Sequence, residues 1–332
     1  MLSFKFKRNL LLSLFVLAII LIAANIFLKS NLIVSDADEN MIVEAEISQR
    51  FKNILTEFEI DTKFIKEDKI KDKNSGREIS SIKVQVPKDL SIPEILQEVF
   101  QTFKKDSLII QSIEKIKGGK TTLALKMASS NVLQAEFDYA KKYSRNKGYI
   151  AFILNDVDPG NSSTVALMES PTRLNFLIRP EIKHIQSLEF IMRNGQQFSV
   201  LIDDDISEQK YNLGESYSER RIVTVIKTLV TDFQRAVCFV VDDKSNFYNS
   251  SNYEILRREL SKRKIKLFRT SDFVNLTQNE MVSVLFNDKM ETLDNGESIV
   301  FLLDEESFVA LNPDLKKYKK KGYRIITSSL IL

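Results

Sequence analysis

Short apolar runs that alternate with helix-like stretches constrain the fold of this chain more than any other feature. From Tyr149 onward there are seven such runs: YIAFIL, RLNFLI, FSVLI, AVCFVV, IKLFR, SIVFLL and YRIITS. Most are separated by stretches with helical periodicity, such as SERRIVTVIKTLVTDFQ and NYEILRRELSKRK. Strands that are apolar on both faces are typical of a parallel sheet covered by helices. We therefore predict an α/β fold over residues 148–332, as a (β/α) barrel of about seven strands rather than an open doubly wound sheet.

The preceding residues, 41–145, show a different pattern and predict a small α+β domain. A helix is expected where Ile47, Phe51, Ile54, Leu55 and Phe58 recur at helical spacing. Lys66 to Glu78 is a charged segment without periodicity and is expected to be a loop. A second helix follows Ser91, with Ser91 and Glu94 as a capping box. Its apolar face is expected to contain Ile92, Leu96, Val99, Phe100 and Phe103. Strands are expected at ISSIKVQV, SLIIQSIEKI, KTTLALKMA and VLQAEFDYA, with KKYSRNKG, residues 141–148, as the linker.

The N-terminal segment, residues 1–30, predicts a cytoplasmic stub and a transmembrane anchor. Lys5, Lys7 and Arg8 precede an uncharged apolar run from Leu10 to Leu28. About 20 such residues are enough for a helix to cross a bilayer, and basic residues tend to stay on the cytoplasmic side. A cleaved signal peptide is the alternative, although its apolar core is normally only about 7–15 residues long. Either reading places most of the chain outside the cytoplasm, on the periplasmic side of a membrane.

The charge and the rare residues exclude several kinds of site. The net charge of +3 comes from 48 basic and 45 acidic side chains, so no nucleic-acid partner is expected. Cys238 is the only cysteine, which excludes an internal disulfide and a thiolate zinc site, and its apolar surroundings predict a core position. His184 is the only histidine. It lies in a stretch with helical periodicity, where a helix-surface or capping role is expected rather than metal binding.

Polar side chains follow most of the predicted strands. Because the carboxyl ends of parallel strands meet at one rim, these side chains are expected to border a common groove. They are Asn155, Asp156, Arg179, Asp203, Asp204, Asp205, Asp242, Asp243, Arg269, Asp272, Asp304 and Glu305. Solvated loops and helix caps explain any single member of this set. Taken together, they predict an acidic mouth that attracts a hard cation or a cationic ligand.

From Gly148 to the C-terminus the chain resembles the divergent polysaccharide deacetylase family. The segments that carry the resemblance are IAFILND, the region from ALMESPTRLNFLIRP to FSVLI, AVCFVVDDKS, LSKRKIKLFRTS, and SIVFLLDEESFVALNPDLKKYKKKGYRIITSS. The region from VPKDLSIPEILQEVF to Tyr139 resembles the accessory domain that precedes the barrel in some members. The resemblance implies a barrel that removes acetyl groups from carbohydrate with a bound divalent metal.

The chain departs from the family at the residues that carry the chemistry. The resemblance implies two carboxylates at the end of the first strand, one acting as base and one binding the metal. This chain has Asn155 and Asp156 there, and these two are its candidates for the catalytic position. The family's metal-binding histidines align with about Leu201, Asp242 and Asp304. Asn155 cannot accept a proton, so the resemblance also implies a lost base.

Any metal site left would be built from oxygen ligands. Asp156, Asp242 and Asp304 are the candidate ligands, and Arg179, Asp203, Asp243 and Arg269 are expected to form the rim of a substrate groove. Hard carboxylate ligands suit Mg²⁺, Ca²⁺ or Mn²⁺ better than zinc, and these ions lower the pKa of a bound water less effectively. No other cofactor is expected.

These observations predict a membrane-anchored, deacetylase-like protein of cell-envelope carbohydrate metabolism. Its barrel is expected to be catalytically degenerate and to act as a glycan-binding or scaffold protein. An active deacetylase or other hydrolase with an altered oxygen-ligated metal site is the alternative. A third hypothesis is that the N-terminal domain docks a partner and the barrel serves only as a platform.

Overall fold

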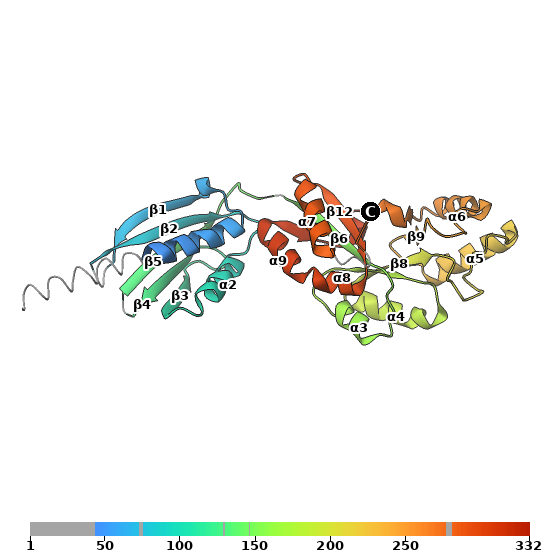
Figure 1. Ribbon diagram of the computed structural model, residues 1–332, viewed down its shortest axis with the longest axis horizontal. Coiled ribbons are helices and arrows are strands. Elements are labelled where there is room, and N and C mark those ends of the chain that lie inside the picture. Colours follow the sequence, from blue (N-terminus) through green and yellow to red (C-terminus); the bar gives the residue numbers. More distant parts are fainter. Residues whose placement is uncertain (1–43, 73–75, 129, 146, 277–280) are drawn as a thin grey trace, which may run out of the picture. The chain divides into compact units, whose positions relative to one another are not determined.

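Residues 44–72, 76–128, 130–145, 147–276 and 281–332 are described by the computed structural model (Figure 1). The chain divides into two compact units, Met1–Ser144 and Arg145–Leu332, and the division falls within the predicted linker at residues 141–148. The apolar segment at residues 10–28, predicted to be an anchor, lies outside the described residues. None of the helices within the described ranges has both the length and the hydropathy needed to cross a bilayer.

The first unit is an α+β fold with a five-stranded mixed sheet. Its strand order is β1-β2-β5-β4-β3, in which only the β2–β5 pair is parallel. The elements are a helix at residues 44–57, β1 (Ile65–Lys71), β2 (Glu78–Val86), α2 (Ile92–Phe103), β3 (Leu108–Glu114), β4 (Thr121–Met127) and β5 (Ser130–Tyr139). A hydrophobic core forms between the two helices and the inward-facing side chains of β2, β4 and β5. The five apolar residues predicted for the first helix are all buried in this core.

Three local predictions in the first unit were wrong. The charged segment after Ile65 is an edge strand, β1, because its backbone pairs antiparallel with β2 and its charged side chains face solvent, as is common at sheet edges. Ser91 occupies the N-cap of α2 with an extended backbone, but its side chain makes no capping hydrogen bond. The buried face of α2 contains Ile95 rather than Phe100, which is 42% exposed.

The second unit is built on a parallel sheet in which each of the seven predicted apolar runs contributes a strand. The order is β10-β9-β8-β7-β6-β12-β11, and β13 pairs with the first residues of β6. All of these pairings are parallel. The strands are β6 (Gly148–Leu154), β7 (Asn175–Ile178), β8 (Gln197–Ile202), β9 (Phe239–Val241), β10 (Leu267–Arg269), β11 (Val274–Asn275), β12 (Ser298–Leu303) and β13 (Tyr323–Ile325).

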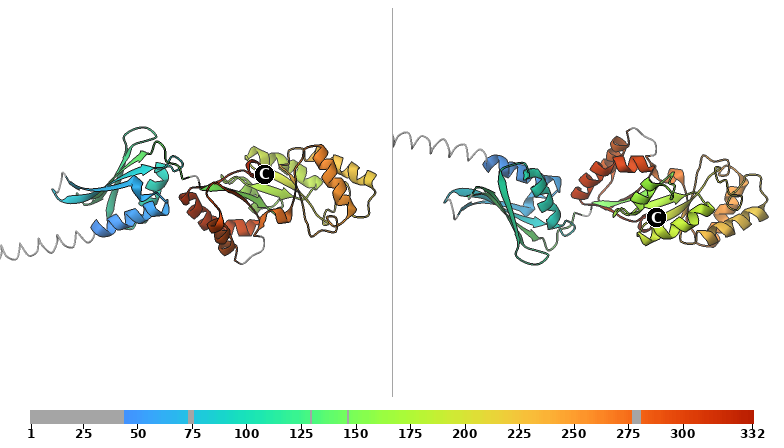
Figure 2. Two further views of the ribbon diagram at one scale, coloured as in Figure 1. Left: turned by 90° about the horizontal axis from the view of Figure 1, so that it is seen from above. Right: turned by 90° about the horizontal axis from the view of Figure 1, so that it is seen from below.

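Helices connect these strands and surround the sheet of this unit, as two further views show (Figure 2). They are α3 (Ser162–Met168), α4 (Ile182–Arg193), α5 (Glu219–Asp232), α6 (Ser251–Lys262), α7 (Val282–Thr292), α8 (Glu305–Ala310) and α9 (Asn312–Lys321). The last predicted helical stretch is divided into α8 and α9 at Asn312 and Pro313, because proline is accepted in the first turn of a new helix but not inside one.

The sheet curls into a partial barrel that does not close by hydrogen bonding. Among the described residues, no ladder joins the edge strands β10 and β11. Arg269 at the end of β10 is nevertheless only five residues from Val274 at the start of β11. A chain segment of that length spans at most about 18 Å, so the two edges must lie near each other. The predicted parallel α/β sheet is therefore confirmed, and it is curled. The predicted closure of this sheet into a full barrel is not confirmed.

The two faces of this sheet bury different sets of side chains. The outer face packs against the helices and forms the larger core, which includes Phe152, Phe176, Phe198, Phe286 and Phe301. The inner face forms a second cluster, composed of Ala151, Ile153, Leu177, Leu201, Cys238, Val240, Phe273, Val300 and Leu302. The inside of the curl is thus a packed core, which also buries Asn175, hydrogen-bonded to the hydroxyls of Ser199 and Ser328.

Candidate rim site

The candidate site lies where the first three strands of the second unit end. Asn155 continues the ladder beyond β6, because its N–H donates to the carbonyl of Leu303 at 2.8 Å. Asp156 follows with a φ of 52°, a left-handed conformation that aspartate adopts more readily than most residues. This turn directs the chain away from the sheet and leaves the Asp156 carboxylate at the rim, with its side chain 48% exposed.

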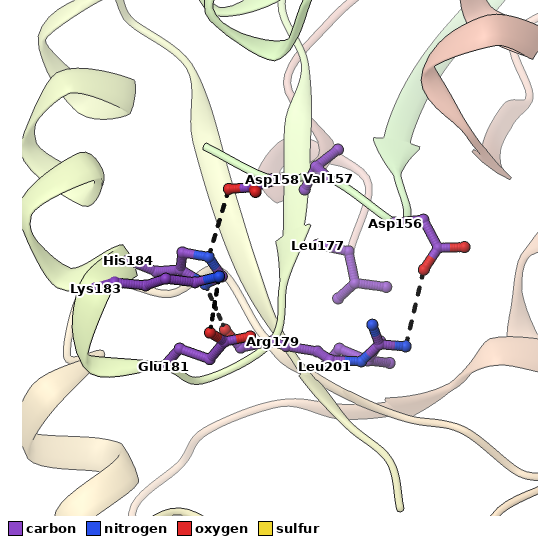
Figure 3. A pocket seen from close by; sticks show the side chains of 9 residues that line it. All are labelled: Asp156, Val157, Asp158, Leu177, Arg179, Glu181, Lys183, His184 and Leu201. Atoms are coloured by element: carbon purple, nitrogen blue, oxygen red, sulfur yellow. Dashed lines mark hydrogen bonds and ion pairs between the residues drawn. The ribbon is translucent and has the colours of Figure 1, made fainter. Parts of the chain in front are cut away.

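Arg179, directly after β7, is the central cation of the rim. Its Nε donates to Oδ2 of Asp203 at 2.6 Å, and its Nη2 lies 3.4 Å from Oδ2 of Asp205. The same Nη2 is 3.8 Å from Oδ1 of Asp156, a contact drawn in Figure 3. One guanidinium thus faces carboxylates that follow β6 and β8.

Burial and pairing act in opposite directions on the two central groups. Burial raises the pKa of the Asp203 carboxyl above its usual value, and the hydrogen bond from Arg179 offsets this only in part. Burial alone would lower the pKa of Arg179, but its interactions with Asp203, Asp156 and Asp205 outweigh burial and raise it. Asp203 therefore depends on Arg179 to remain ionised at the rim.

A cavity of about 220 Å³ opens beside this cluster (Figure 3). Its lining comes from the loop after β6, from the end of β7, from the first turn of α4 and from β8. The lining residues are Asp156, Val157, Asp158, Leu177, Arg179, Glu181, Lys183, His184 and Leu201. Leu177 and Leu201 belong to the inner-face core, so the cavity has an apolar part among its charged groups.

His184 is buried in this cavity, which contradicts the predicted helix-surface role. It lies in the first turn of α4 and is 5% exposed. Its Nδ1 lies 3.0 Å from the carbonyl oxygen of Arg179, and its Nε2 lies 3.8 Å from Oδ1 of Asp158. Sequence reasoning also missed Asp158 and Lys183. Their positions shortly after strand ends were the available signal, because the first turn of a helix that follows a strand faces the rim.

Most of the other rim residues have partners outside this cluster, whereas the buried Oδ1 of Asn155 has no hydrogen-bond partner among the described residues. Asp242 accepts a hydrogen bond from the N–H of Lys244 at 3.0 Å, and Asp243 accepts one from the Thr270 hydroxyl at 2.7 Å. Arg269 pairs with Asp272 at 2.6 Å. Asp304 caps α8, with Oδ1 accepting from the N–H of Ser307 at 2.7 Å. Of the predicted rim residues, the structure brings together Asp156, Arg179, Asp203 and Asp205.

The residues present do not fit the divalent metal that the resemblance implies. Arg179 lies among the carboxylates that would have to hold the ion, and a guanidinium there repels a second cation. Leu201 aligns with one of the family's histidine ligands and has no donor atom. Among the described residues, no three His, Cys, Asp or Glu side chains are grouped so that they could hold a metal. Asp156, Asp242 and Asp304, the predicted metal ligands, do not form such a group among the described residues, and their role stays a prediction.

No model of a known protein family matches the chain, and no curated protein is similar to it in sequence. Similar solved structures include a CE4-family pseudoenzyme from Bacillus anthracis, with 12% identity over 71% of this chain and 94% of that one, at a TM-score of 0.38. The catalytic domain of a peptidoglycan N-acetylglucosamine deacetylase from Eubacterium rectale has 10% identity over 57% of this chain and 91% of that one, at 0.39. A CE4 esterase from Streptococcus mutans has 14% identity over 55% of this chain and 87% of that one, at 0.38. These neighbours include deacetylases, the class of protein that the sequence resembles. At such identities and TM-scores, function has to be argued from the rim itself.

Proposed function

We propose that this chain is a deacetylase-like protein that binds a cell-envelope glycan without hydrolysing it. The observation that carries the proposal is the position of Arg179 between Asp156 and Asp203. Hydrolysis of an amide at this rim needs an activated water and a base within reach of it. Here the Arg179 guanidinium pairs with Asp203 and lies close to Asp156 and Asp205, and Asn155 stands where the resemblance implies the base.

The same geometry suits the recognition of a sugar. Sugar sites combine a few polar groups that bind hydroxyls with an apolar surface that packs against the ring. The cavity offers the Asp156 and Asp158 carboxylates, and its apolar floor comes from the almost fully buried side chains of Leu177 and Leu201. The resemblance to carbohydrate deacetylases in the sequence supports the same class of ligand.

The first experiment compares binding with turnover. The full chain, purified in mild detergent because residues 10–28 are apolar, is sedimented with insoluble chitin and with isolated cell-wall glycan. Acetate release is measured in parallel with added Mn²⁺, Mg²⁺ or Zn²⁺. We expect cosedimentation without acetate release. Metal-dependent release of acetate that Asp156→Ala abolishes would instead establish the alternative, an active enzyme with an oxygen-ligated metal.

The proposed location follows from the sequence of the N-terminal segment. Residues 10–28 would form a single anchoring span, with residues 41–332 on the periplasmic side. Protease added to spheroplasts should then degrade the bulk of the chain, whereas a cytoplasmic marker protein should survive. Protection of the chain from this protease would contradict the proposed orientation.

A further inference from the structure

His184 presents a buried acceptor to the cavity. A carbonyl oxygen can only accept, so the 3.0 Å contact with the Arg179 carbonyl requires that Nδ1 carry the hydrogen. In the neutral ring Nε2 is then an acceptor. This atom is buried and has no hydrogen-bond partner among the described residues. Such groups are rare in folded proteins, and one that lines a cavity points to a missing partner.

Asp158 shows what kind of partner is missing. Its Oδ1 lies 3.8 Å from Nε2 of His184, too far for a direct hydrogen bond, and its side chain is 61% exposed (Figure 3). Carboxylate oxygens and the Nε2 lone pair are both acceptors. A group that donates two hydrogen bonds would satisfy both of them.

The surrounding charge indicates which donor fits best. Five carboxylates, those of Asp156, Asp158, Glu181, Asp203 and Asp205, lie in or beside the cavity, against the two permanent cations Arg179 and Lys183. Arg179 is held by Asp203, and Lys183 lies 3.1 Å from Glu181. Lys183 also interacts electrostatically with Asp158, but the carboxylates of this group still outnumber its permanent cations by five to two. An ammonium, which donates up to three hydrogen bonds and carries a positive charge, therefore suits this position better than a neutral hydroxyl.

We propose that the cavity recognises a de-N-acetylated amino sugar within a glycan, with its ammonium group between Asp158 and His184. The ring would lie above the part of the cavity where the almost fully buried Leu177 and Leu201 form the floor, and its hydroxyls would reach Asp156. This inference rests on the proposed glycan-binding function and adds the identity of the sugar. An N-acetylated sugar lacks the positive charge and carries a bulkier group at the same position.

Calorimetric titration of the full chain in detergent tests the proposal with four probes. These are a β-1,4-linked glucosamine tetramer, its N-acetylated form, cellotetraose and tetralysine. We expect the glucosamine tetramer to bind at least tenfold more tightly than each of the others, and added salt to weaken its binding. Equal binding of the three sugars would overturn the amino-sugar inference and leave glycan binding intact. Binding of none of the sugars would overturn both proposals. If tetralysine bound as tightly as the glucosamine tetramer, the cavity would recognise positive charge alone, and the amino-sugar inference would be overturned.

Two matched variants assign the effect to the cavity. Asp158→Asn keeps the size of the side chain and the oxygen that accepts from the Gly160 N–H, so the fold should be retained. It should remove most of the preference for the glucosamine tetramer. Glu254→Gln removes an exposed carboxylate of α6 that pairs with Arg257 and does not line the cavity, so it should leave the preference unchanged. A preference that survives Asp158→Asn would overturn the proposed position of the ammonium.

Discussion

Nε of Arg179 lies 2.6 Å from Oδ2 of Asp203, and this ion pair joins the ends of β7 and β8 at the rim of the curled sheet. The Asp203 side chain is only 7% exposed, so its charge depends on this partner. Breaking a buried pair leaves an uncompensated charge, which costs more than the pair itself contributes. The rim is therefore held together by a cation supplied by the protein chain.

Removing that cation should destabilise the second unit. We expect Arg179→Met to lower the free energy of unfolding by about 2–4 kcal/mol at pH 7, because Asp203 remains buried without its partner. The folded-state pKa of Asp203 is already raised, so its charged form is the costly one. The deficit should shrink as the pH falls, because protonation of Asp203 removes that charge. Urea unfolding between pH 5 and pH 8 measures both effects.

Arg269→Met is the matched control for this variant. Arg269 also lies at the rim, but its pair with Asp272 is more exposed. Exposed pairs contribute less than about 1 kcal/mol, so this variant should unfold almost as the unmodified protein does. Equal losses in the two variants would contradict a special role for the Arg179–Asp203 pair.

Arg179→Met should also create an affinity for divalent cations at the rim. Without the guanidinium, Asp156, Asp203 and Asp205 are left as unneutralised hard oxygen ligands. Millimolar Ca²⁺ should then raise the melting temperature of Arg179→Met by about 2–4 °C, the shift that about 1 kcal/mol produces in a unit of this size. The unmodified chain should show no such shift. Equal Ca²⁺ stabilisation of both proteins would mean that Arg179 does not exclude a cation.

A cluster of charged side chains at the end of α6 predicts a further dependence of stability on pH. Lys262 and Arg263 lie 2.6 Å and 2.9 Å from the carboxylate of Glu259, and their hydrogen bonds lower the pKa of Glu259 from 4.5 to about 2. A lowered pKa gives stability that is fully present above pH 4.5 and is lost as the pH falls toward 2. Glu259→Gln should therefore be less stable than the unmodified chain at pH 6, and the difference should disappear near pH 2. Glu254→Gln, which breaks an exposed pair with Arg257, should show little difference at either pH.

The sequence predicted the strands well because their signal is local. Each of the seven apolar runs forms a strand, and most of them do so as strands buried on both faces of the sheet, which must be continuously apolar. Strand β1 was missed because its charged side chains are exposed and its pairing with β2 comes from backbone groups. Closure of the barrel could not be predicted either, because it depends on whether two distant edges form a ladder.

The sequence predicted which residues lie at the rim but not how their side chains contact one another. Strand ends identified Asp156, Arg179, Asp203 and Asp205 as neighbours, and these four do come together. The sequence carried no sign that Arg179 would neutralise the carboxylates, because the direction of a long side chain is set by tertiary packing. His184 was missed for a related reason, since a helical stretch does not reveal which of its turns faces a cavity.

The buried thiol of Cys238 should report unfolding of the second unit. The residue is fully buried, its Sγ lies 3.2 Å from Oγ of Ser199, and burial raises its pKa to about 11. The thiolate is the reactive form, so a disulfide reagent at pH 8 should leave the folded protein unmodified and react once urea unfolds it. A Ser216→Cys variant adds a second thiol in an exposed loop. In the folded variant, one of the two thiols should react with the reagent at once. Fast reaction of Cys238 in the folded protein would contradict its place inside the sheet.

Gly148 should be irreplaceable at the start of β6. Its φ is 145°, and a Cβ atom there would lie 2.5 Å from the backbone carbonyl oxygen of Glu297. That oxygen also accepts the N–H of Tyr149 at 2.9 Å, so it cannot move away without breaking the contact that begins the strand. We expect Gly148→Ala to lower the free energy of unfolding by more than about 2 kcal/mol. Gly119→Ala, where the nearest atom would be 3.7 Å away, should cost far less. Chemical denaturation of both variants checks the difference, and equal stabilities would show that β6 can begin without this close approach.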